Sequence, residues 1–148
     1  MSGGALATGL AVAAGLAGSV QIAVMSRLGE RVGVTEALAV ATALTAALAL
    51  VALLIARRSV AGFERSLHVP WWMLSGSVLS LLIVFTITYA GPRIGTTATV
   101  GILIAGQLVM GAAIDRWGLF GSRQIALHWP RVLGILLLAG GAALSLRR

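Results

Sequence analysis

Cysteine is absent from this chain of 148 residues, and charged residues make up only 10% of it. The lack of cysteine excludes disulfides, thiolate metal ligands and cysteine nucleophiles. Four residues are acidic and all eleven basic residues are arginine, whereas 59% of the chain is hydrophobic. This composition is not that of an ordinary soluble domain. The net charge of +7 comes from scattered arginines, which predict anchoring near anionic lipid rather than nucleic-acid binding.

What the sequence does contain is five apolar stretches, at residues 4–25, 37–56, 69–90, 94–114 and 129–146. About 20 helical residues cross a hydrocarbon core of about 30 Å, and four of the stretches meet that length. The fifth is short, but Pro130 can open a helix near Trp129, with Arg131 extending outward to the interface. We therefore predict an all-α integral membrane protein, with residues 1–148 forming one five-helix transmembrane domain.

The first stretch differs from a secretory signal peptide, because no basic residue precedes it and its apolar run exceeds about 15 residues. We expect it to be a retained helix. The predicted connections are short, covering residues 27–36, 57–68, 91–93 and 115–130. Gly91-Pro92 predicts a tight turn between the third and fourth helices, and the last connection is expected to lie along the membrane interface.

The arginines are almost evenly divided between the two sides of the membrane. Five spans place the ends of this chain on opposite sides, and the side of residue 1 receives six arginines against five on the other. The positive-inside rule needs a clear excess. Two interpretations remain: the side of residue 1 is cytoplasmic, or the chain inserts in both orientations. Four tryptophans are expected as anchors at the interface on the side of residue 1: Trp71, Trp72, Trp117 and Trp129.

Small residues recur along the predicted helices, as close helix packing in lipid requires. Generic packing explains them, and contact with a second subunit is the alternative. The candidates for packing or dimer contact are Gly15, Ser19, Gly101, Ala105 and Gly134.

No ionisable residue lies at the centre of a predicted span, although proton-coupled pumps commonly use an intramembrane carboxylate. Three residues near helix ends are candidates for coupling or for interfacial charge: Asp115, Glu36 and Arg93. Asp115 adjoins Arg116, which favours an interfacial ion pair or cap, and Glu36 fits the first turn of the second helix.

Two glutamines are the strongest polar candidates within the membrane. Gln107 lies near mid-depth of the fourth helix and Gln21 lies in the second half of the first. An amide in hydrocarbon is unfavourable without partners, so both must face protein or water. They either join helices by hydrogen bonds or line a solute pathway, with Tyr89 and Thr99 as further pathway candidates. Serine and threonine hydroxyls more often bond back to the preceding helical turn.

Enzyme chemistry is not predicted. The two histidines, His68 and His128, are isolated, and no paired carboxylates, metal-spaced ligands, phosphate loop or nucleophile motif occurs. We predict no catalytic residues, no metal and no cofactor.

Several short segments in order resemble the YdcZ-like family, small five-helix bacterial members of the drug/metabolite transporter (DMT) superfamily. The segments are Pro70-Trp71-Trp72 with Gly76, Gly91-Pro92-Arg93-Ile94-Gly95, Gly106-Gln107, Asp115 with Gly118-Leu119-Phe120-Gly121, and Arg131 with Gly134. Gln21 also matches, whereas Met25 replaces an asparagine of the family pattern.

The resemblance implies one half of a ten-helix, inverted-repeat (EamA/DMT-like) transporter in the bacterial cytoplasmic membrane. It implies a small-molecule substrate and a second subunit, with the pathway near the midplane where the halves meet. The leading hypothesis is an antiparallel homodimer that works by alternating access. The alternatives are half of a heterodimer with a homologous partner and a membrane scaffold or accessory protein that transports nothing.

Overall fold

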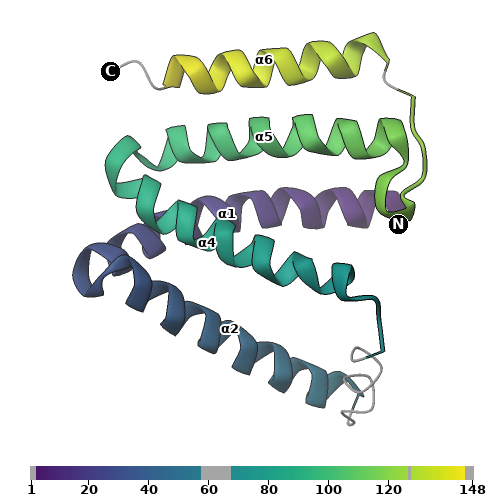
Figure 1. Ribbon diagram of the computed structural model, residues 1–148. Helices are drawn as coiled ribbons and strands as arrows, with labels where there is room; N and C mark the ends of the chain where they lie inside the picture. Colours follow the sequence, from purple (N-terminus) through teal and green to yellow (C-terminus); the bar gives the residue numbers. More distant parts are fainter. Residues whose placement is uncertain (1–2, 58–67, 127, 146–148) are drawn as a thin grey trace. The chain divides into compact units, whose positions relative to one another are not determined.

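The computed structural model describes residues 3–57, 68–126 and 128–145, and these segments are almost entirely helical. The long helices are α1 (Gly3–Val32), α2 (Val34–Arg57), α4 (Ser75–Ile94), α5 (Thr96–Trp117) and α6 (Trp129–Ser145) (Figure 1). Two short 3-10 helices, η1 (Trp71–Leu74) and η2 (Leu119–Gly121), precede α4 and follow α5. The chain forms two compact units, Met1–Ala23 with Arg93–Arg148, and Val24–Pro92.

The helix lengths confirm an all-α integral membrane protein. Within the described residues, four helical segments are long and apolar enough to cross a bilayer: Gly3–Val32, Val34–Arg57, Trp71–Ile94 and Thr96–Trp117. The fifth, α6, is apolar but has 17 residues, which corresponds to about 26 Å at the helical rise and is slightly less than the hydrocarbon thickness.

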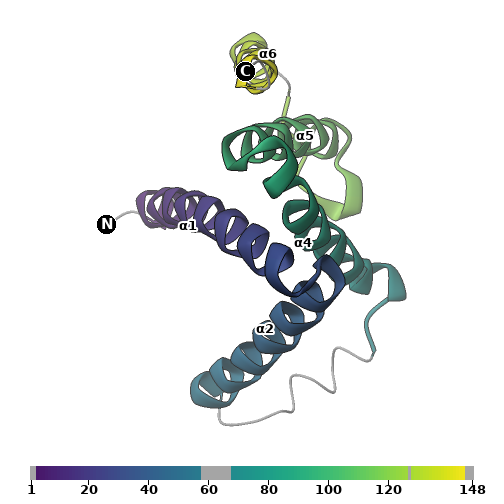
Figure 2. The same cartoon turned by 90° about the vertical axis from the view of Figure 1, so that its left-hand side faces the viewer.

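The first connection is much shorter than the predicted 27–36. Helix α1 continues to Val32, so Arg27, Glu30 and Arg31 lie on the helix, and Arg27 Nη1 is 3.2 Å from Glu30 Oε2. The chain bends only at Gly33, whose φ of 99° is open to glycine and strained for other residues. Nothing before Gly33 stops the helix. Figure 2 shows the sharp bend between the C-terminal end of α1 and α2.

The predicted turn at Gly91-Pro92 is wrong. Both residues are helical and lie inside α4, and the break comes at Gly95, with φ 86°. The physical reason is that the proline ring fixes a φ compatible with a helix, whereas leaving the helix here uses a positive φ that glycine supplies.

In the unit Val24–Pro92, α1 and α4 meet at a glycine. A Cβ added to Gly29 would lie 2.6 Å from Thr88 Cγ2, which is too close for a real contact. Thr88 is fully buried, and its hydroxyl donates to the Val84 carbonyl at 2.7 Å. The missing side chain at Gly29 therefore makes room for the threonine methyl group.

In the other unit, α5 and α6 pack side by side and antiparallel (Figure 1). A close approach is again at a glycine, because a Cβ on Gly101 would lie 3.1 Å from Ala142 Cβ. Among the described residues the buried apolar side chains are mostly small, with alanine as four of the seven: Ala37, Ala98, Ala112 and Ala142, beside Ile22, Met25 and Ile87. Close approach of helices, rather than a core of large side chains, holds each unit together.

The contact between Gly29 and Thr88 predicts a specific pair of substitutions. Gly29→Ala should destabilise the protein by about 1–3 kcal/mol, because the overlap with Thr88 Cγ2 outweighs the better helix propensity of alanine. Thermal unfolding in detergent measures the change. Thr88→Ser removes Cγ2 and keeps the hydroxyl bond to Val84.

The double variant Gly29→Ala with Thr88→Ser should therefore regain wild-type stability or exceed it, giving a coupling free energy between the two sites. Gly15→Ala on the same helix is the matched control, because no atom lies within 4 Å of its added Cβ. Equal destabilisation by Gly29→Ala with and without Thr88→Ser would contradict the contact.

Candidate functional site

The described residues hold one ion pair between different helices, and it joins α5 to α6. Arg131 Nη2 donates to Asp115 Oδ2. The side chains are 40% and 25% exposed, respectively, so the pair is partly shielded from solvent. Asp115 thus pairs with Arg131 rather than with the neighbouring Arg116 that the sequence suggested, and Arg131 turns toward α5 instead of extending away from the bundle.

The charges of this pair oppose both helix dipoles. Asp115 lies in the last turn of α5, where a negative charge is unfavourable, and Arg131 lies in the first turn of α6, where a positive charge is unfavourable. The charge of each residue is unfavourable at its own helix end. The ion pair with the other residue, across the α5–α6 connection, compensates for this.

The connection itself folds back on the end of α5. Gly118 caps α5 in the left-handed conformation (φ 61°), and its N–H donates to the Ile114 carbonyl. The Ile125 N–H donates to the Asp115 carbonyl at 2.9 Å, and Gln124 Nε2 lies 3.5 Å from the Trp117 carbonyl. Both the backbone and the side chain of Asp115 therefore hold the hairpin closed.

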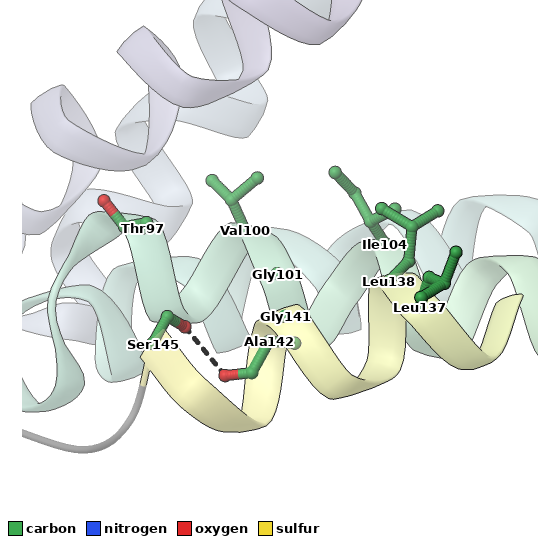
Figure 3. A pocket seen from close by; sticks show the side chains of 9 residues that line it. All are labelled: Thr97, Val100, Gly101, Ile104, Leu137, Leu138, Gly141, Ala142 and Ser145. Carbon is green, nitrogen blue, oxygen red and sulfur yellow. Dashed lines mark hydrogen bonds between the residues drawn. The ribbon is translucent and has the colours of Figure 1, made fainter. Parts of the chain in front are cut away.

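A groove of about 290 Å³ runs between α5 and α6. Figure 3 shows Val100 and Ile104 of α5 along it, opposite Leu137 and Leu138 of α6. Its remaining lining is Thr97, Gly101, Gly141, Ala142 and Ser145. Ser145 Oγ donates to the Ala142 carbonyl at 2.7 Å, so the groove surface is largely apolar.

Gln107 is the twelfth of the 22 residues of α5, at the middle of the helix, and its side chain is exposed. At 100° per residue it lies about 20° from Val100 and about 60° from Ile104 around the helix, so it shares the side of α5 that carries these two groove residues, although it does not itself line the groove. The described residues provide no hydrogen-bond partner for its amide.

The other pathway candidates lie in different surroundings. Gln21 is exposed on α1, also without a partner among residues 3–57, 68–126 and 128–145. Tyr89 is exposed on α4 and stacks on Phe85, with ring centroids 6.0 Å apart. Thr99 is buried, and its hydroxyl donates to the Gly95 carbonyl at 2.9 Å. Among the described residues, hydroxyls also donate to the carbonyl four residues earlier at Thr8, Ser19, Thr45, Thr86 and Thr88, as the sequence predicts.

Glu36 and Arg93 both lie where they complement a helix dipole. Glu36 is in the first turn of α2, and its carboxylate lies against Gly33, filling the space that a Cβ there would need. Arg93 is in the last turn of α4 and is exposed. Both charges are favourable at these helix ends.

The small residues fall into two groups. Gly101 makes the close contact with Ala142, and Ala105 follows one turn later on α5. Gly15 and Gly134 have open space where a Cβ would be, and Ser19 is half-buried beside the Gly15 turn.

The tryptophans all lie at helix ends. Trp71 begins η1, Trp117 ends α5 and Trp129 begins α6, and each is more than half exposed. Trp72 is 39% exposed. Within residues 3–57, 68–126 and 128–145, no three His, Asp or Glu side chains gather where they could hold a metal ion.

Three features escaped the sequence reasoning. Gly29 and Gly33 form a G-x-x-x-G pattern, which is typical of helices that approach each other closely. The pairing of Asp115 with Arg131 joins residues 16 apart, and only the fold-back of the connection makes it. Ser26 Oγ on α1 is buried with no hydrogen-bond partner among the described residues, and nothing in the sequence distinguishes it.

Exchanging the charges of the ion pair gives a test of its role. Asp115→Asn should destabilise the protein by up to about 1 kcal/mol, since the pair is partly exposed. The swap Asp115→Arg with Arg131→Asp should be at least as stable as the wild type, because both charges then suit the helix dipoles. Unfolding of the single and double variants in detergent measures this. If the swap is no more stable than Asp115→Asn, the pair does not hold the hairpin.

Comparison with known proteins identifies the family. The family described as "Putative inner membrane exporter, YdcZ" matches residues 6–144. The chain is similar to the "Inner membrane protein YdcZ" of Escherichia coli (strain K12), with 33% identity over 97 residues. That alignment covers 65% of this chain and 64% of the relative, slightly less than two thirds of the relative's length. No solved structure matches the chain.

The family match spans nearly the whole chain and agrees with its apolar helices. The chain belongs to the YdcZ family and is a multi-pass protein of the bacterial inner membrane.

Proposed function

We propose that this chain is one half of a membrane transporter of the DMT type, which moves a small polar or amphipathic solute by alternating access. The description of its family as an inner membrane exporter supports transport. Its five helices would correspond to one repeat of a ten-helix, inverted-repeat carrier, with the solute site near the midplane between two such halves.

The observation that carries the proposal is the exposed amide of Gln107 at mid-depth of α5. A buried amide without partners costs several kcal/mol in hydrocarbon. Lipid therefore cannot be its neighbour, and the amide needs either a second protein surface or a water-filled pathway. A dimeric carrier supplies both.

The residues around Gln107 support a protein partner on this face. Gly111 is one turn further along α5, and a Cβ there would meet no atom within 4 Å. A small residue beside a polar one on the same face is typical of helix contacts in membranes.

In this proposal the partner is a second, antiparallel copy of the chain. Five spans with six arginines on one side and five on the other favour insertion in both orientations. Gln107 is the first candidate for the solute pathway, followed by Gln21 and Tyr89. Thr99 contributes less, because its hydroxyl is bonded to Gly95. A neutral amide lining suits neutral or zwitterionic solutes.

A ligand screen with purified full-length protein tests the proposal. Amines, amino acids, sugars and nucleosides are added one at a time, and thermal unfolding is measured in detergent. A solute at about 100 times its Kd should add about 2.7 kcal/mol of apparent stability. Gln107→Ala should abolish that shift and also stop uptake of the same solute into proteoliposomes.

The matched control is Val109→Ala on the same helix, which is 58% exposed and points away from Gln107. It should retain both the shift and the uptake. A solute that stabilises the wild type and Gln107→Ala equally would remove Gln107 from the pathway. Failure of every solute to be transported by folded protein would favour the scaffold hypothesis.

The antiparallel arrangement has its own test. The natural chain lacks cysteine, so Ser122→Cys in the α5–α6 connection provides one thiol. In intact cells, an impermeant thiol reagent should label a fraction of the molecules, and permeabilisation should expose the rest. Labelling that is complete or absent before permeabilisation would show a single orientation and favour a heterodimer with a homologous partner.

A further inference from the structure

The α5–α6 hairpin ends in an excess of positive charge. Arg116, Arg123 and Arg131 lie in residues 115–131, and Asp115 is the acidic residue among them. Asp115 neutralises Arg131. Arg116 and Arg123 are exposed, and neither has an acidic partner in the part of the chain that the structure describes. Two positive charges are therefore left without an acidic partner among residues 3–57, 68–126 and 128–145.

The folded connection keeps these two arginines at the same end of the hairpin. Ile125 N–H bonds to the Asp115 carbonyl, one residue before Arg116, and Gln124 packs against Gly118. Arg123 is the next residue back from Gln124. The backbone of residues 122–125 is thus fixed against the last turn of α5, which pre-organises the charges at little further cost in entropy.

Aromatic side chains surround this charge. Trp117, Phe120 and Trp129 are 66%, 69% and 70% exposed, and they come from the end of α5, from η2 and from the start of α6. Tryptophan at the ends of membrane helices resides at the depth of the lipid headgroups. Arg116 and Arg123 therefore lie at the depth where lipid phosphates are found, and not in bulk water.

We propose that this end of the hairpin, formed by Arg116, Arg123, Trp117, Phe120 and Trp129, is a docking surface for the headgroup of an anionic phospholipid. A guanidinium presents a planar fork of donors that matches phosphate oxygens, and the aromatic rings pack on the glycerol and upper acyl region. Charge complementarity selects an anionic lipid over a zwitterionic one. Because Arg131 is paired with Asp115, the surface presents two guanidinium groups, those of Arg116 and Arg123. Two charges are enough for one headgroup and are fewer than in a broad basic patch.

This inference does not depend on transport. It concerns a face of the protein at the membrane interface, whereas the proposed pathway residue Gln107 is at mid-depth of α5. Loss of lipid binding and loss of solute binding are therefore separable by experiment.

Native mass spectrometry of the delipidated full chain in detergent tests the proposal. Phosphatidylglycerol and phosphatidylethanolamine are titrated separately, and the fraction of lipid-bound protein is measured. The wild type should bind phosphatidylglycerol more tightly than phosphatidylethanolamine. Arg116→Gln with Arg123→Gln should weaken phosphatidylglycerol binding by about tenfold or more and erase the difference between the lipids.

The control is Arg31→Gln with Arg57→Gln, which removes the same charge from exposed positions at the ends of α1 and α2. It should leave the preference intact. If the variant with Arg116→Gln and Arg123→Gln does not fold, Arg116→Lys with Arg123→Lys replaces it. Lysine keeps the positive charge but lacks the planar guanidinium, so a partial loss of phosphatidylglycerol binding is expected.

Two results would overturn the docking surface. One is equal loss of phosphatidylglycerol binding in the control and in the variant at 116 and 123, which would mean a diffuse effect of net charge. The other is full displacement of the lipid by millimolar inorganic phosphate, which would identify a site for soluble anions instead.

Discussion

The structure depends on how closely its helices can approach, because lipid provides little hydrophobic drive for helix association. In each compact unit a close contact between two helices has a glycine on one side: Gly29 against Thr88, and Gly101 against Ala142. Large apolar side chains remain exposed, as expected where they face lipid. The packing of the helices therefore depends on a few small residues. A single methyl group added at Gly29 or Gly101 would press against the neighbouring helix.

Among the described residues, the charged side chains lie near the ends of the helices or in the α5–α6 connection, and none is at the middle of a helix. Glu36 and Arg93 suit the dipoles of α2 and α4. Asp115 and Arg131 oppose the dipoles of α5 and α6 and are kept by each other. Because the pair neutralises itself, the surplus charge of the hairpin end lies on Arg116 and Arg123, where it is free to meet a lipid phosphate.

The sequence predicts the membrane class and the five helices, because hydropathy over about 20 residues is a strong average. It predicts helix ends less well. Gly33 and Gly95 end helices through a positive φ, whereas Gly91-Pro92, the stronger turn pattern, stays helical. The mid-helix position of Gln107 could be predicted, but the Asp115–Arg131 pair could not, because it depends on the backbone of the folded connection. A contact between residues far apart in the chain cannot be predicted from a local sequence pattern.

Helix α5 carries the residue on which the proposal of a second subunit depends. One face carries Gly101 and is occupied by α6. Further along the helix, Gln107 and Gly111 lie on the side that also carries Val100 and Ile104, and the described residues give the Gln107 amide no hydrogen-bond partner. A helix with one lipid-facing side would place leucine or valine there, as α2 does along most of its length. The amide at mid-depth therefore identifies a part of α5 that needs water or protein beside it, and the proposed dimer would supply both.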